Sequence, residues 1–152
     1  MKVSFILNGK PEKADERAGT TLFDYLRAQG LFSVKYGSDR GETGADSVLI
    51  DDKIYNSSLL LLYRLENKSV VTLEYFSSGT GIHPLQAAFI NEGAIQCGYC
   101  TPGLILAAEA LLKRVSAPSE LEVRQALAGV YCRCTGYVKP IKAVMKYSGS
   151  EL

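Results

Sequence analysis

The chain has 152 residues, which is enough for one compact domain or two very small ones. Hydrophobic residues make up 47% and charged residues 22%, as in an ordinary globular protein, and a formal net charge of +1 gives no reason to expect nucleic acid or a membrane surface as a partner. No long apolar run is present, and the four leucines at 59–62 are far too few to span a bilayer.

The start of the chain predicts a strand rather than a signal peptide. Residues 2–7 lead into Asn8-Gly9, a strong hairpin-turn signal, and residues 10–14 supply the returning strand. A signal peptide would need a longer apolar stretch and a cleavage site of small residues. We therefore expect a cytoplasmic protein, and in that compartment cysteines serve as metal ligands more often than as disulfides.

A short helix and three more strands complete the predicted first half. Thr20 or Thr21 can cap a helix that runs to about Gln29, and Gly30 can stop it. Residues 33–47 hold three glycines and show no periodicity, which predicts a loop. The remaining strands are expected near residues 47–50, 53–55 and 69–73. Short mixed strands with one helix favour an α+β, β-grasp-like domain over residues 1–76.

The composition changes at residues 77–82, which we interpret as a linker, and residues 83–152 predict a helical domain. Pro84 lies in the first turn of its first helix, Thr101 is the expected cap of the second, and Ser119 begins a capping-box pattern. The four expected helices cover residues 84–92, 101–114, 119–128 and 139–147. Together they predict a compact four-helix domain.

All four cysteines lie in this helical half, at Cys97 and Cys100 and again at Cys132 and Cys134. In the first pair, Gly98 frees the backbone to turn so that both sulfurs can reach one centre. The following helix N-terminus favours thiolates there. Spacing alone leaves several sites open: a 2Fe–2S cluster, a structural zinc ion, a redox disulfide or plain buried thiols. The second pair has a C-x-C spacing, which is less usual for structural zinc.

The residues around the cysteines carry more information than their spacing. The sequence QCGYCTPG at 96–103, followed by CRCTGY at 132–137, closely resembles the small subunits of the xanthine oxidase, or molybdenum hydroxylase, family. The resemblance covers nearly the whole chain. It implies a ferredoxin-like β-grasp domain followed by a helical domain that binds the 2Fe–2S cluster nearest the molybdenum cofactor, with the ligands Cys97, Cys100, Cys132 and Cys134. It also implies that Gln96 hydrogen-bonds the pterin and that Cys134 is the ligand closest to the pterin amine.

One departure from the family concerns its other cluster, which the β-grasp domain normally carries. The family's ligands follow a plant-type C-x4-C-x2-C pattern with a fourth cysteine further on, and the aligned residues here are Ser38, Thr43, Asp46 and Ser58. Hydroxyls are poor ligands for iron–sulfur clusters, and one aspartate cannot replace three cysteines. The resemblance therefore predicts a single cluster. Acidic side chains in this loop could bind Mg²⁺ or Ca²⁺, although solvated carboxylates are the plainer interpretation.

The resemblance implies an electron-transfer subunit with no active site of its own, in a hetero-oligomer with a large molybdopterin-binding catalytic subunit. Related assemblies send electrons through the second cluster to a flavin-binding medium subunit, so its predicted loss leaves that partner open. A second hypothesis is a redox-neutral complex, of the hydratase or hydrolase type, in which the cluster is structural. A third is a stand-alone regulatory module that binds zinc or an iron–sulfur cluster.

Overall fold

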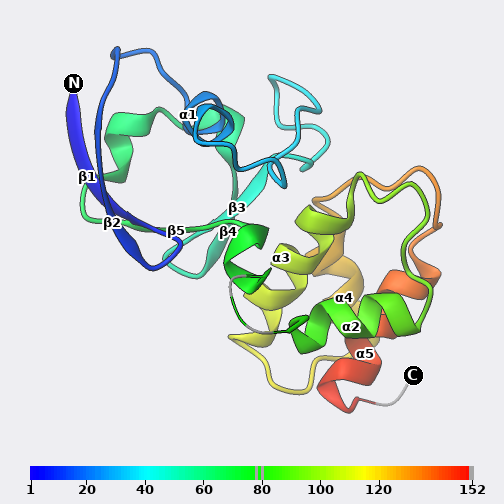
Figure 1. The fold of residues 1–152 in the computed structure, drawn as a ribbon. Coiled ribbons are helices and arrows are strands. Elements are labelled where there is room, and N and C mark those ends of the chain that lie inside the picture. The colour runs from blue at the N-terminus through cyan, green and yellow to red at the C-terminus, as the bar shows by residue number, and fades with distance from the viewer. Residues whose placement is uncertain (78, 80, 151–152) are drawn as a thin grey trace.

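The computed structural model describes residues 1–77, 79 and 81–150. Within these residues the sheet and the main group of helices occupy opposite ends of the molecule, with the N-terminus beside the sheet and the C-terminus beside the helices (Figure 1). The predicted α+β class is confirmed. The predicted linker at 77–82 includes residues 78 and 80, which lie outside the described residues.

The described strands form one five-stranded mixed sheet. Its strand order is β2 (Lys10–Asp15), β1 (Lys2–Leu7), β5 (Ser69–Val71), β3 (Ser47–Ile50) and β4 (Lys53–Asn56). Strands β1 and β5 are parallel, and the other neighbours are antiparallel. All five strands were predicted within two residues of their observed ends. The β1–β2 hairpin forms at the predicted Asn8-Gly9 turn.

Helix α1 (Leu22–Ala28) crosses one face of this sheet (Figure 1). As predicted, Thr21 caps it: the Thr21 side chain accepts a hydrogen bond from the backbone N of Asp24 at 3.1 Å. Its apolar face enters the core of the sheet half through Leu22, Tyr25 and Leu26. Residues 29–46, which follow, form neither helix nor strand, in agreement with the predicted loop.

Three short 3-10 helices escaped prediction, at η1 (Ser57–Leu59), η2 (Leu62–Leu65) and η3 (Leu73–Ser77). The last one shortens the strand that we expected to reach residue 73. The four leucines at 59–62 are not buried together, since Leu62 is buried whereas Leu59 is 55% exposed. Runs of three to five residues are too short to carry a readable helical period.

The second half contains α2 (Pro84–Asn91), α3 (Thr101–Leu112), α4 (Glu120–Leu127) and α5 (Val138–Ser148). The four-helix prediction is thus confirmed for the described residues. Helix α4 begins with the predicted Ser119 capping box. In α2, His83 is the N-cap, with its ring nitrogen accepting from the backbone N of Leu85 at 3.3 Å. The only histidine of the sequence therefore has a structural task.

The predicted cap of α3 is wrong. Cys100, not Thr101, occupies the N-cap position, and its side chain makes no capping hydrogen bond. Cys100 already has helical dihedral angles, φ −80° and ψ −14°, because the tight Cys97–Cys100 turn runs directly into the helix. A capping hydroxyl needs an extended residue at this point, which the turn does not supply.

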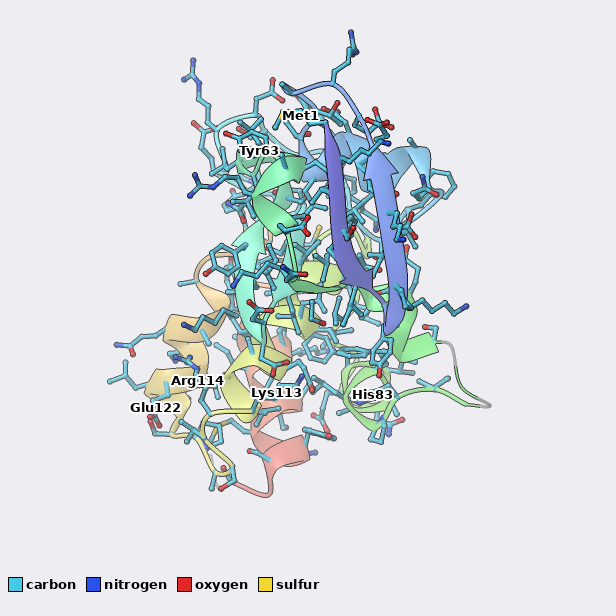
Figure 2. The ribbon with its side chains drawn as sticks, turned by 90° about the vertical axis from the view of Figure 1, so that its left-hand side faces the viewer. Met1, Tyr63, His83, Lys113, Arg114 and Glu122 are labelled. Atoms are coloured by element: carbon cyan, nitrogen blue, oxygen red, sulfur yellow. The ribbon has the colours of Figure 1, made fainter. Side chains whose placement is uncertain are left out.

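Each half has its own hydrophobic core, and α3 joins them. One face of α3 packs into the helical core with α2, α4 and α5. Its other face places Leu106 and Ala110 against Leu49 of β3. An ion pair between Lys113, at the end of α3, and Asp52, in the β3–β4 turn, lies where the helices meet the sheet (Figure 2). The sheet half is therefore fixed against α3, the helix whose N-cap is Cys100.

Candidate iron–sulfur site

The two cysteine segments meet at one pocket of about 340 Å³. Its walls come from both cysteine segments and from the loop after α1, and the lining residues are Tyr36, Gly37, Thr43, Ala45, Cys97, Tyr99, Cys100, Tyr131, Cys132, Arg133 and Cys134. Cys100 and Cys132 are buried, each 7% exposed, whereas Cys97 and Cys134 are exposed. The pocket therefore has a buried sulfur end and an exposed sulfur end.

Within the pocket the thiols interact in two pairs. Cys97 and Cys134 influence each other's pKa, and so do Cys100 and Cys132. Each pair joins one cysteine from each segment. Among the described residues, no three His, Cys, Asp or Glu side chains gather so that they could hold one metal ion. The strongest interactions of the thiols thus lie within these two pairs.

Within each pair, the pKa of one thiol is raised and the pKa of the other is lowered. Burial and the hydrogen bond to Cys132 raise the pKa of Cys100 to about 12. Burial opposes ionisation of Cys132 as well, but hydrogen bonds from the side chain and backbone of Thr135 lower its pKa overall. The backbone N of Tyr99 lowers the pKa of Cys97, and donation to Cys97 raises the pKa of Cys134. A metal binds thiolates, so its binding would displace the protons that the thiols carry.

The Cys97–Cys100 segment is a tight turn that ends in α3. Gly98 has a φ of +81°, a conformation that favours glycine, and the carbonyl of Gly98 accepts from the backbone N of Thr101 at 3.4 Å. This turn brings Cys97 and Cys100 to the same pocket and starts α3 at Cys100. The predicted role of Gly98 agrees with this geometry.

The Cys132–Cys134 segment is held by two polar side chains whose role sequence reasoning missed. The Tyr137 hydroxyl accepts from the backbone N of Cys132 at 2.8 Å and donates to the carbonyl of Val130 at 3.0 Å. The Thr135 hydroxyl lies 3.0 Å from the Cys132 sulfur. Tyr137 itself does not line the pocket. Its position five residues after Cys132, in a turn, was the available signal.

Arg133 and Gln96 lie at the exposed end. The Arg133 guanidinium donates to the Tyr131 hydroxyl at 3.2 Å and lines the pocket. Gln96 is exposed immediately before Cys97. Gln96 does not line the pocket, and its exposed side chain is accessible to a partner.

The residues aligned with the family's other cluster are linked through hydrogen bonds. The Ser58 backbone N donates to Asp46 Oδ2 at 2.7 Å, and the Ser58 hydroxyl donates to the carbonyl of Ser38 at 3.4 Å. The Thr43 hydroxyl accepts from the backbone N of Ala45 at 3.3 Å. Asp46 is only 1% exposed, and its Oδ1 has no partner among the described residues. The oxygen side chains fold the loop internally, and no group of three metal-binding side chains is found in the described residues.

The described helices include none that is both long and apolar enough to cross a membrane.

Comparison with known proteins identifies the family. A model described as a [2Fe-2S] binding domain matches residues 72–145. The chain is 43% identical to the xanthine dehydrogenase iron-sulfur-binding subunit of Escherichia coli O157:H7, over 91% of this chain and 89% of that protein. It is 37% identical to the nicotinate dehydrogenase small FeS subunit of Eubacterium barkeri, over 96% of this chain and 93% of that protein.

A solved structure has the same fold. The crystal structure of quinoline 2-oxidoreductase from Pseudomonas putida 86 matches with a TM-score of 0.92 and 37% identity, over 97% of this chain and 92% of the matched chain. The identity and coverage of the sequence relatives are high enough to settle membership. The chain belongs to the iron–sulfur-binding small subunits of the xanthine dehydrogenase, or molybdenum hydroxylase, family.

Proposed function

We propose that this chain is the electron-transfer subunit of a molybdopterin-dependent hydroxylase, and that Cys97, Cys100, Cys132 and Cys134 hold its single 2Fe–2S cluster. The observation that carries the proposal is the pairing of the four thiols into two cross-segment pairs around one pocket. A 2Fe–2S cluster needs four thiolates, two on each iron, and such pairs fit it better than one zinc ion. When bound, the cluster supplies one-electron transfer.

The chain's own residues would position this group and set its environment. Cys100 and Cys132 form the buried end, where hydrogen bonds from Thr135 stabilise a thiolate. Cys97 and Cys134 form the exposed end, next to the exposed Gln96. The exposure of this end supports a contact of Gln96 and Cys134 with the pterin, as the family resemblance implies. No catalytic residue is assigned to this chain.

The proposed partner is a large molybdopterin-binding subunit in a hetero-oligomer. We further propose a β-grasp domain at residues 1–76 and a helical cluster-binding domain at 83–152, in a cytoplasmic protein. The separate hydrophobic cores of the two halves support this division. A flavin-binding medium subunit is a weaker proposal, because the loop at Ser38 and Thr43 offers hydroxyls where the relay to flavin would need thiolates.

A redox-neutral complex is the second candidate function. It is favoured by the same loop, because a chain without the onward relay does not need to pass electrons outward. In such a complex the four cysteines would hold a structural cluster, whose binding free energy contributes to folding.

One experiment separates the two candidates. The purified complex is mixed anaerobically with xanthine, nicotinate or quinoline, the compounds named in the relatives above, and the visible absorption of the cluster is followed. Electron transfer predicts bleaching at the rate of turnover. Product formation with an oxidised cluster, and with no acceptor required, would establish the redox-neutral function instead.

The role of Gln96 has its own test. Gln96→Ala is expected to lower the molybdenum cofactor content of the complex while leaving two irons per chain, since a lost buried hydrogen bond costs about 1–3 kcal/mol. Gln125→Ala, a change at an exposed position of α4 outside the pocket, is the matched control. Equal cofactor content in both variants would remove the proposed contact.

A further inference from the structure

One lysine reaches from the first half of the molecule into the cysteine turn. Lys35 lies at the start of the loop that follows α1, and its backbone N donates to the carbonyl of Ala45 at 3.1 Å. Its side chain crosses to the helical half, where Nζ donates to the carbonyl of Gly98 at 3.2 Å. Gly98 is the residue between Cys97 and Cys100 whose positive φ shapes the turn. A cation from one half is therefore bound to the backbone of the metal-binding turn in the other.

A second contact fixes the same pair of segments. The Tyr99 hydroxyl donates to the carbonyl of Tyr36, and the Lys35 ammonium lies 5.2 Å from the centre of the Tyr99 ring. A cation over an aromatic face is attracted to it. Lys35 thus contacts both residues that separate Cys97 from Cys100.

The other cysteine segment touches this loop as well. The backbone N of Tyr131, one residue before Cys132, donates to the carbonyl of Thr43 at 2.8 Å. The loop from 35 to 45 is consequently bonded to both segments that carry the cysteines. Its ends are part of the pocket wall through Tyr36 and Ala45.

The charge of Lys35 is not cancelled by a carboxylate. None of the ion pairs between described residues involves Lys35. Its side chain is half-buried, so water screens its field less than it would screen that of an exposed lysine. Arg133, a cation that lines the pocket, is exposed and bonded to Tyr131.

We propose that Lys35 is a positioning residue for the cluster, which fixes the Cys97–Cys100 turn through Gly98 and raises the reduction potential by its charge. The inference rests on the proposed function, because it presumes a 2Fe–2S cluster on these cysteines. A cluster on four thiolates is anionic and gains one more negative charge when it is reduced. A nearby cation stabilises the reduced form more than the oxidised form, so reduction becomes easier.

The test compares three variants of the intact complex. Lys35→Met removes the charge and keeps the length of the side chain, Lys35→Arg restores the charge, and Lys13→Met removes an exposed lysine of β2 as a matched control. Iron content is measured first. The midpoint potential is then determined by titration with dithionite, monitored by electron paramagnetic resonance.

We expect Lys35→Met to keep its iron and to lower the equilibrium constant for reduction about tenfold, which is about 59 mV for a one-electron couple. Lys35→Arg should recover most of the shift, and Lys13→Met should match the wild type. If Lys35→Met instead loses iron that Lys35→Arg retains, the positioning role is supported directly.

Two outcomes overturn the inference. One is an unchanged potential in Lys35→Met with full iron content. The other is an equally lowered midpoint potential in Lys35→Met and Lys35→Arg, which would show that the charge of Lys35 does not set the potential. A wild-type complex without two irons per chain would be a failure of the proposed function, and the first measurement identifies it before any variant is compared.

Discussion

The family pattern places cluster ligands in two regions of this chain, and only one of these regions carries cysteines. The loop at 38–46 has the spacing of a plant-type cluster loop, yet it carries oxygen side chains that bond within the loop and to Ser58. The segments at 97–100 and 132–134 carry thiols that face one another across a pocket. The comparison shows that a backbone can keep the form of a metal-binding loop after its ligands are gone, because hydroxyls and a carboxylate can satisfy the same turns.

The loop without cysteines has kept a structural task. Gly44 has a φ of +62°, and a Cβ at this position would lie 2.2 Å from the carbonyl oxygen of Gly129. The carbonyl of Thr43 accepts from Tyr131, and Lys35 reaches Gly98. The loop therefore packs backbone against backbone on the helical half, and this packing requires glycine.

The largest expected effect comes from replacing a cysteine ligand, compared with replacing a hydroxyl in the loop at 38–46. Cys97→Ser should abolish the cluster and lower the thermal midpoint of the helical half, since two segments lose their shared metal centre. Ser38→Ala, at the aligned position of the other loop, should leave two irons per chain. Iron analysis with thermal unfolding checks both. A Ser38→Ala protein as poor in iron as Cys97→Ser would refute the ligand assignment.

The next effect tests the structural task of the loop. Gly44→Ala should destabilise the protein by about 2–5 kcal/mol, because the strained backbone and the clash with Gly129 act together. Gly19→Ala is the control, since a Cβ there meets nothing within 4 Å. Thermal unfolding of the two proteins gives the difference. Equal midpoints would mean that the loop does not depend on its close approach to the helical half.

The smallest effect concerns the backbone of the second cysteine segment. Tyr137→Phe should cost about 1–3 kcal/mol, because it leaves the backbone N of Cys132 and the carbonyl of Val130 without their shared partner. Among the described residues, the Tyr131 hydroxyl bonds only to the exposed Arg133, so Tyr131→Phe should cost less than about 0.5 kcal/mol. Thermal unfolding again measures both. A Tyr131→Phe protein less stable than Tyr137→Phe would contradict the assignment of Tyr137.

The sequence was most informative where local chemistry determines the structure. Asn8-Gly9 and Ser119 marked a hairpin and a helix start correctly, because turn and cap preferences depend on neighbouring residues only. The prediction that Thr101 caps α3 was wrong because the Cys97–Cys100 turn continues into the helix. The contacts of Lys35 with Gly98 and of Tyr131 with Thr43 join residues that lie far apart in the chain, and no periodicity or spacing encodes such pairs.

At the cysteine site, too, the sequence predicted the local features but not the packing. Spacing placed four sulfurs in two segments, and the flanking residues pointed to the family. Neither revealed that Cys100 and Cys132 would be the buried pair, since burial follows from how α3 packs on the sheet and on the other helices. Likewise the hydrogen bonds of Thr135 and Tyr137 depend on a left-handed turn at Tyr137 that is rare outside glycine and asparagine.

The most direct test of the account is the metal content of the purified complex, measured as iron, zinc and acid-labile sulfide per small subunit and combined with electron paramagnetic resonance of the reduced protein. Because only Cys97, Cys100, Cys132 and Cys134 supply thiolates, we predict two irons, two sulfides and a single cluster signal from this chain, with little zinc. Four irons per chain would show that the loop at 38–46 still holds a cluster, and stoichiometric zinc without visible absorption would show that the cysteines hold no cluster; either result would contradict the account.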